Sequence, residues 1–296
     1  MAEISTQGDL ARQTILRRQS ADVRAALDAR VAEIGSGKKA DIAKEVKGDF
    51  SLLASIERDL QALSAYKTSA TELETRAAST QVALEKMRGL VEDVVPRLLQ
   101  APSTGLASFA EGLAVDSRQR LEAMTSALNT TLGGRSLFAG ADTTGPAVAS
   151  AGTMLADIEA AIAASGATEP AAVAAEIAAW FAPGGDFETG AYLGSDQTIA
   201  AQDVGNGRRL GLSATAADPR LRDVLTGIAT AAIADRPPID GRPEAQAELV
   251  SLAGDRLLEA TEGLTALQSE VGLVQAELES VVAANSAEET ALKVTR

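Results

Sequence analysis

The chain has 296 residues, and its composition excludes most catalytic chemistry: only 3% of the residues are aromatic, and neither His nor Cys occurs. Without Cys there are no disulfides, thiolate nucleophiles or Cys-type zinc sites, and without His the most common general base and metal ligand is missing. Lys and Arg number 27 against 41 Asp and Glu, so the formal net charge is −14, the wrong sign for generic binding to nucleic acid or to an anionic membrane surface. We therefore expect no enzyme, with no catalytic residue, cofactor or metal site, and neither nucleic acid nor membrane as a partner.

The N-terminus carries no signal for the general secretory route. Residues 1–10 lack the basic stretch followed by an apolar stretch that a cleaved signal peptide needs, and no run of about 18 apolar residues occurs. We expect either a cytoplasmic protein or one exported through a machine that reads an uncleaved N-terminus.

The first predicted element is a helix over residues 5–34 with one apolar face. Arg residues lie among its other positions, so the helix is amphipathic and basic. Gly35-Ser36-Gly37 is typical of a helix end, and a short connector then reaches Gly48. The apolar face is formed by Leu16, Val23, Leu27, Val31 and Ile34.

The longest predicted helix runs from Asp49 to about Leu99, with apolar residues at alternating steps of three and four. At about 1.5 Å per residue it would reach roughly 75 Å, far beyond the usual globular helix. Such a stripe needs a partner helix, and the last part of the chain, from Leu249 to Val281, repeats the spacing. We expect the two segments to pair into a rod whose core contains Leu53, Ile56, Leu60, Leu63, Leu84, Met87, Val91, Leu264, Leu267, Val271, Val274 and Leu278.

Prolines predict where the long helix ends. Pro96 lacks a backbone donor and should bend or end the helix just before it. Residues 101–105 then predict a turn. A third helix follows over 106–128, with Ser108 and Glu111 as a capping box at its start.

The character of the sequence changes after this third helix. Gly133-Gly134 should end it, and Leu137 and Phe138 are the first bulky apolar residues after the turn. Residues 136–207 then contain nine acids and no Lys or Arg, with Ala-rich helical pieces near 154–164 and 170–182. We expect a separate, solvated domain there.

A short hairpin and a helix lead back to the rod. Asn206-Gly207 before the alternating Leu210 and Leu212 is the strongest short-range signal of a β-hairpin. Asp218-Pro219 supplies a helix cap and a first-turn proline, which predicts a helix over 220–234. A stretch rich in Pro and Gly then returns the chain to the last rod segment.

Three motifs suggest ligand sites but have simpler structural interpretations. Gly35-Ser36-Gly37-Lys38 lacks the first Gly of a phosphate-binding loop and follows a helix, so a helix stop explains it better. The glycines from Gly205 to Gly211 have one residue too many for a dinucleotide fingerprint, and the hairpin turn explains them. The acidic tract over 136–207 lacks the ligand pattern of a calcium loop, so a solvated acidic face is the preferred interpretation.

These elements predict a mainly α fold: a long antiparallel helical rod, like a coiled coil, formed by the N- and C-terminal segments, with a small α+β outer domain that contains a β-hairpin. The predicted division has three parts. Residues 1–46 form an amphipathic helix and elbow, residues 47–133 with 244–296 form the rod, and residues 134–243 form the inserted outer domain.

The sequence resembles the bacterial flagellin superfamily and, within it, the hook-associated junction proteins. The most specific phrase is Leu128-Asn129 followed by Gly133-Gly134-Arg135-Ser136-Leu137-Phe138-Ala139-Gly140. Ile4-Ser5-Thr6 and the elbow Gly35-Ser36-Gly37-Lys38-Lys39 are similar to landmarks of the same family, as is Ala217-Asp218-Pro219. The resemblance covers most of the chain and is less clear in its middle.

The resemblance implies a self-assembling structural subunit of the flagellum that joins hook to filament. It implies export by the flagellar type III apparatus without a cleaved signal peptide, and an extracellular location. The implied partners are copies of the chain itself, the hook-side junction protein, flagellin and an export chaperone. The apolar face of the first helix would then pack subunits together, and Leu137 with Phe138 would join the rod to the outer domain.

Two other interpretations remain open: flagellin itself, the main filament subunit, and a cytoplasmic coiled-coil scaffold. The resemblance also implies a further amphipathic helix at the end of the chain, paired with the N-terminal one. The sequence ends at Thr295-Arg296 without it, and one interpretation is a truncation.

Overall fold

The computed structural model describes residues 3–36, 50–104 and 107–295. The chain divides into two compact units, one made of residues 1–61 with 292–296 and the other of residues 62–291. We describe each by itself. The predicted elbow after Ser36 lies outside the described residues.

The first unit contains the whole of α1 (Glu3–Ser36), the first turns of α3 and the last residues of α9. The predicted helix over residues 5–34 is confirmed by α1. Leucine, valine and isoleucine recur along α1, and Arg30 donates a hydrogen bond of 2.7 Å to Glu33 one turn later. Within the same unit, Ile56 of α3 is buried.

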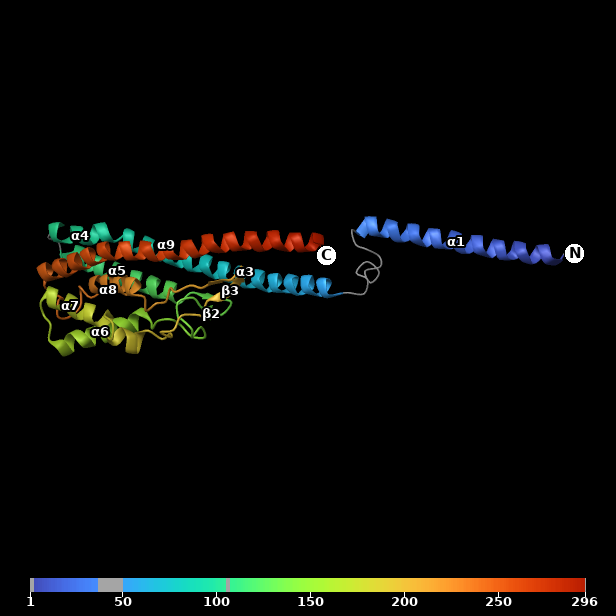
Figure 1. The fold of residues 1–296 in the computed structure, drawn as a ribbon. Coiled ribbons are helices and arrows are strands. Elements are labelled where there is room, and N and C mark those ends of the chain that lie inside the picture. Colours follow the sequence, from blue (N-terminus) through green and yellow to red (C-terminus); the bar gives the residue numbers. More distant parts are fainter. Residues whose placement is uncertain (1–2, 37–49, 105–106, 296) are drawn as a thin grey trace. The chain divides into compact units, whose positions relative to one another are not determined.

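The second unit is built on two long helices, α3 (Ser51–Glu92) and α9 (Pro243–Thr295), which lie side by side in Figure 1. Leu73 of α3 and Leu278 of α9 belong to one small buried cluster. Lys67 lies 3.9 Å from Glu289 across the same pair of helices. The predicted mainly α fold, with long paired helices and small hairpins, is confirmed.

A two-residue turn separates α3 from α4 (Val95–Thr104), as the sequence predicted from Pro96. Pro96 is the second residue of α4, where a missing N–H costs no helical hydrogen bond. The predicted turn over 101–105 is wrong, because α4 continues through Pro102 to Thr104. The predicted capping box is also wrong, since α5 (Ala107–Leu128) already includes Ser108.

A hairpin that the sequence did not predict follows α5. Its strands, β1 (Thr131–Leu132) and β2 (Arg135–Ser136), pair antiparallel around Gly133 and Gly134. Both glycines are left-handed, with φ of 58° and 76°, as a type I′ turn requires. Two-residue strands are too short to show alternation in the sequence, so the glycines alone indicate a helix end.

The acidic tract contains α6 (Ala151–Ser165), α7 (Pro170–Phe181) and one turn of π-helix, η1 (Phe187–Ala191). The two predicted Ala-rich helices are therefore confirmed. Ser150 caps α6 by accepting the Thr153 N–H at 3.1 Å. Aromatic rings from α7, η1 and the next residue form one group; they are Trp180, Phe181, Phe187 and Tyr192.

The predicted hairpin is confirmed by β3 (Gln202–Gly205) and β4 (Arg208–Leu210), with Asn206 and Gly207 both left-handed. The next predicted helix is α8 (Pro219–Ala232). It is capped by Asp218, whose carboxylate accepts the Arg220 N–H at 2.9 Å. Eleven residues of α8 are buried, so this helix lies inside the molecule.

One hydrophobic cluster includes residues from α3, α4, α5 and α9 together with residues from α6, α7 and α8. Helix α8 packs extensively against α5 and α7. The residues predicted for the rod and for the outer domain thus share a core. The boundaries at 134 and 243 stay a prediction.

Candidate functional site

The first candidate surface is the apolar face of α1, which we call the α1 stripe: Leu16, Val23, Leu27, Val31 and Ile34. Steps of seven, four, four and three residues keep these side chains on one side of a helix. Their exposed fractions are 63%, 67%, 63%, 62% and 85%. The stripe is therefore an uncovered helix face of the first unit.

An uncovered face of this kind favours association with another helix. Burial of one Leu, Val or Ile side chain contributes about 1.5–3 kcal/mol. Contiguous exposed apolar surface typically marks a site of interaction with a partner. The stripe carries no group that could act as an acid, a base or a nucleophile, so its chemistry is that of packing.

The second candidate is the interface between α3 and α9 in the second unit, which we call the seam. Its best-buried predicted residues have no exposed surface: Leu84, Met87, Val91, Leu264, Leu267 and Leu278. Val271 and, nearer the start of α3, Leu63 are also buried. Val274 is partly buried against the same small cluster as Leu278. Of the remaining predicted core residues, which lie in the first unit, Ile56 is buried whereas Leu53 and Leu60 are half-buried.

Glycines allow other helices to approach α9 closely. A Cβ on Gly227 of α8 would lie 2.5 Å from the Leu257 Cγ. A Cβ on Gly254 of α9 would lie 3.1 Å from the Leu98 Cβ of α4. Because real Cβ contacts are longer, a larger residue at either position would push the helices apart. The sequence alone indicates no role for these glycines, because the residues that they contact are distant in the chain.

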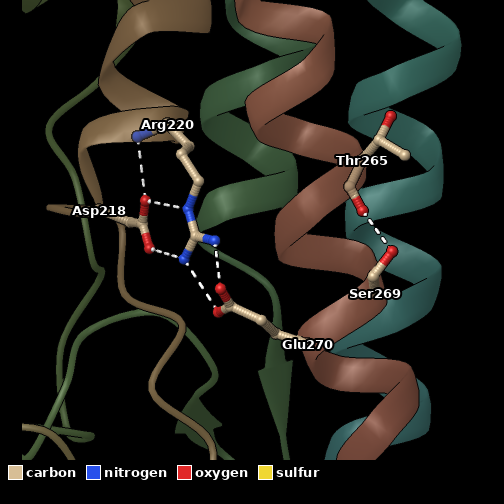
Figure 2. A network of polar contacts seen from close by, with 5 residues as sticks. All are labelled: Asp218, Arg220, Thr265, Ser269 and Glu270. Atoms are coloured by element: carbon tan, nitrogen blue, oxygen red, sulfur yellow. Dashed lines mark hydrogen bonds and ion pairs between the residues drawn. The ribbon is translucent and has the colours of Figure 1, made fainter.

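An ionic cluster joins α8 to α9, as Figure 2 shows. Arg220 donates to Asp218 through Nε at 2.9 Å and through Nη2 at 2.7 Å. Its Nη1 donates to the Glu270 Oε1 at 2.6 Å. Hydrogen bonds to the two carboxylates raise the pKa of Arg220. The nearby Ser269 bonds the Thr265 carbonyl at 2.9 Å, within α9 itself.

A buried amide ties α9 to the second hairpin. Asn285 donates its Nδ2–H to the Val204 carbonyl at 2.8 Å and is 3% exposed. A Cβ on Gly205 would lie 2.7 Å from the Asn285 Oδ1, so the turn fits only without a side chain there. Asn285 continues the three-four spacing of the apolar residues of α9. A polar residue at such a core position is the signal in the sequence that could have identified this contact.

The predicted join, Leu137 and Phe138, lies directly after β2. Both side chains are buried, at 3% and 0% exposure. Arg76 of α3 donates to the Leu137 carbonyl at 3.2 Å, and the Phe138 carbonyl accepts the Ala216 N–H at 2.8 Å. The two residues thus contact both α3 and the segment that precedes α8. Their role as a join between domains stays a prediction.

Within the described parts of the chain, no group of three or more Asp or Glu residues is arranged to hold a metal ion. No helix among residues 3–36, 50–104 and 107–295 is both long and apolar enough to cross a membrane.

Comparison with known proteins finds a likeness in fold. No protein-family model and no curated protein sequence matches the chain. A solved structure of a "putative flagellar hook-associated protein" from Vibrio parahaemolyticus superposes with a TM-score of 0.54 at 16% sequence identity. The superposition covers 86% of this chain and 96% of that one. The chain thus shares the fold of that structure over 86% of its own length.

Proposed function

We propose that the chain is a structural subunit of the bacterial flagellum and serves as a hook-associated junction protein between hook and filament. The observation that carries the proposal is the likeness in fold, which spans 96% of the structure described as a "putative flagellar hook-associated protein". The phrase from Gly133 to Gly140, which resembles the same superfamily, supports it. The mainly apolar character of the candidate surfaces fits a subunit that assembles and does not catalyse.

In this proposal, subunits associate through the α1 stripe. Five apolar side chains at 62–85% exposure would be covered by helices of neighbouring subunits. Burial of such side chains at about 1.5–3 kcal/mol each can offset the loss of translational and rotational freedom on association. The polar and basic residues of α1 would then lie on the sides of the helix that these contacts leave uncovered.

The seam has a different task in the same proposal. Its side chains are covered within one chain, so the fold of the second unit does not depend on neighbouring subunits. A unit that is folded before assembly can carry mechanical load in the assembled flagellum. We further propose that residues 134–243 form an outer domain on that body, with Leu137 and Phe138 at the join.

The partners in this proposal are copies of the chain, the hook-side junction protein, flagellin and, before export, a chaperone. The protein would reach the extracellular flagellum through the type III apparatus, without cleavage of a signal peptide. Membrane and nucleic acid are not among the expected partners, because the formal charge of −14 repels both.

Antibody labelling of isolated hooks and intact flagella from the source bacterium tests the proposal. A single labelled band where the hook meets the filament would support a junction protein. Label along the whole filament would instead identify a flagellin. Label restricted to the cell body would overturn a flagellar role and favour a cytoplasmic scaffold. Flagella from a strain that lacks the gene provide the control for antibody specificity.

A further inference from the structure

A pocket with two arginines lies between α3 and the two hairpins. Its volume is about 370 Å³, and its wall combines Arg76 of α3, Arg135 of β2 and Gln202 of β3. An adjoining hollow of about 560 Å³ continues along α3 past Leu132. All of these residues belong to the second unit.

The two guanidinium groups have no carboxylate partner among the described residues. Arg76 uses Nη2 for the carbonyls of Ser136 and Leu137, at 3.5 and 3.2 Å, and its other nitrogens make no hydrogen bond there. Arg135 donates through Nε to the Thr143 hydroxyl at 3.1 Å. Most other arginines near the seam pair with Asp or Glu, as Arg220 does.

The electrostatics of the pocket disfavour two unpaired cations. Burial lowers the pKa of Arg76, and the nearby charge of Arg135 lowers it further. Arginine nevertheless stays protonated in proteins, so both positive charges persist. A bound anion would relieve the repulsion and would supply acceptors for the unused N–H groups.

A third polar group restricts the type of anion. The Oε1 of Gln202 is buried without a hydrogen-bond donor. The complementary ligand therefore has an acidic group and an N–H or O–H nearby. A peptide segment with an acidic side chain has both, and the adjoining hollow of about 560 Å³ along α3 leaves room for the rest of such a segment.

We propose that this pocket binds a carboxylate group, with Arg76 and Arg135 as donors and Gln202 as the acceptor for a neighbouring N–H. One source is an acidic side chain of a second copy of the chain, from the stretch 136–207 that carries nine acids and no Lys or Arg. The other source is a free small acid with an N–H or O–H close to its carboxylate. The first source rests on the proposed self-assembly, whereas the chemistry of the pocket does not.

Exposed acids in that stretch are available to a second copy. Asp157, Asp186 and Asp196 are exposed and form no ion pair with any described residue. Glu72 also lines the pocket, four residues before Arg76, yet makes no ion pair with it. Glu72 would compete with a bound carboxylate for the two arginines, so replacement of Glu72 by Gln should strengthen carboxylate binding.

An NMR titration of the purified full chain tests the two arginines of the pocket, with glutarate as a carboxylate probe that supplies no donor to Gln202, and with the arginine Nε–H and Gly133 N–H resonances as the readout. Glutarate should shift these resonances, and its neutral analogue glutaramide should not. Arg76→Gln and Arg135→Gln should each weaken glutarate binding by about tenfold or more. Arg58→Gln, which removes the same charge from α3 outside the pocket, should leave the affinity unchanged. Glu72→Gln should increase it.

Sedimentation at low salt distinguishes the two sources. Self-association that glutarate competes away, and that Arg135→Gln weakens, would identify the second copy as the source. Glutarate binding with unchanged self-association would identify a free acid. The pocket proposal is overturned if glutarate causes no shift, or if it binds Arg76→Gln and Arg135→Gln as tightly as the parent. Circular dichroism verifies the fold of each variant. Because Arg135 is exposed, Arg135→Gln should disturb the fold little.

Discussion

The α1 stripe and the seam carry the same sequence pattern and have opposite environments. In α9, apolar residues such as Leu257, Leu264 and Leu278 recur at steps of three and four and are fully buried. In α1, Leu27 and Val31 recur in the same way and are more than 60% exposed. The difference lies in the partner: α3, α4 and α8 pack against α9 within one chain, whereas the side chains of the α1 stripe are exposed.

The comparison shows that apolar periodicity predicts that a helix has an apolar face, but not which partner covers that face. A three-four repeat identifies which side of a helix is apolar. Whether that side contributes to folding or to assembly depends on segments far away in sequence. Substitutions in the seam should therefore lower the free energy of unfolding, and substitutions in the stripe should lower assembly alone.

The largest expected effect comes from deletions that test which elements complete the seam. The Ala141 N–H donates to the Gln197 carbonyl at 2.7 Å, so residues 142–196 can be removed and Ala141 joined to Gln197 through an Asn-Gly turn. This variant keeps α8 and should keep a cooperative thermal transition, measured by circular dichroism. Deletion of residues 134–243 also removes α8, which packs on α5, and should broaden or abolish the transition. Equal melting of the two variants would show that α8 contributes nothing to the core.

The next effect is loss of volume in the seam itself. Leu84→Ala and Leu264→Ala each remove a fully buried side chain. Each should lower the free energy of unfolding by about 2–5 kcal/mol, through lost transfer energy and a cavity. Denaturant unfolding measures this, with Glu85→Gln on the exposed side of α3 as the control. If both Ala variants unfolded like the parent, the paired-helix core would be refuted.

A smaller, pH-dependent effect concerns the contact between η1 and α8. Glu188 accepts the Gly184 N–H and pairs with the buried Arg222, and both interactions lower the pKa of the Glu188 carboxyl. A lowered pKa stabilises the fold above the unfolded value, about 4.3, and this contribution disappears as pH falls through the folded value.

Melting temperatures of the parent and of Glu188→Gln should therefore differ most near neutral pH and converge below about pH 4. Thermal melts over this range measure the convergence. Asp157→Asn, an exposed change in the same acidic stretch, should stay close to the parent throughout. A difference between parent and Glu188→Gln that stayed constant down to pH 3 would contradict a contribution from the ion pair.

The smallest effect on folding is expected in the α1 stripe. Val23→Ser with Leu27→Ser should change the free energy of unfolding by no more than about 0.5 kcal/mol, because both side chains are exposed. The same double variant should fail to form the junction, which motility and labelling of hooks in the source bacterium measure. Arg24→Gln, on another side of α1, is the matched control. If the double variant formed normal junctions between hook and filament, the α1 stripe would not be needed for assembly.

Much of the fold could be predicted from the sequence because its signals are local. A three-four repeat over dozens of residues specifies α1, α3 and α9, and Pro96 specifies the break between α3 and α4. Asn206-Gly207 specifies the second hairpin, since both residues tolerate positive φ. These properties depend on neighbours within a few residues, so no tertiary context is needed to read them.

The rest was decided only by tertiary structure. The helical continuation of α4 past Pro102, the first hairpin at Gly133-Gly134 and the burial of α8 against α5 all depend on packing. So does the pocket around Arg76 and Arg135, which are 59 residues apart in the sequence and meet because β2 lies against α3. The physical reason is that burial and charge pairing are set by distances in space, and a linear pattern specifies distances only along one helix or one turn.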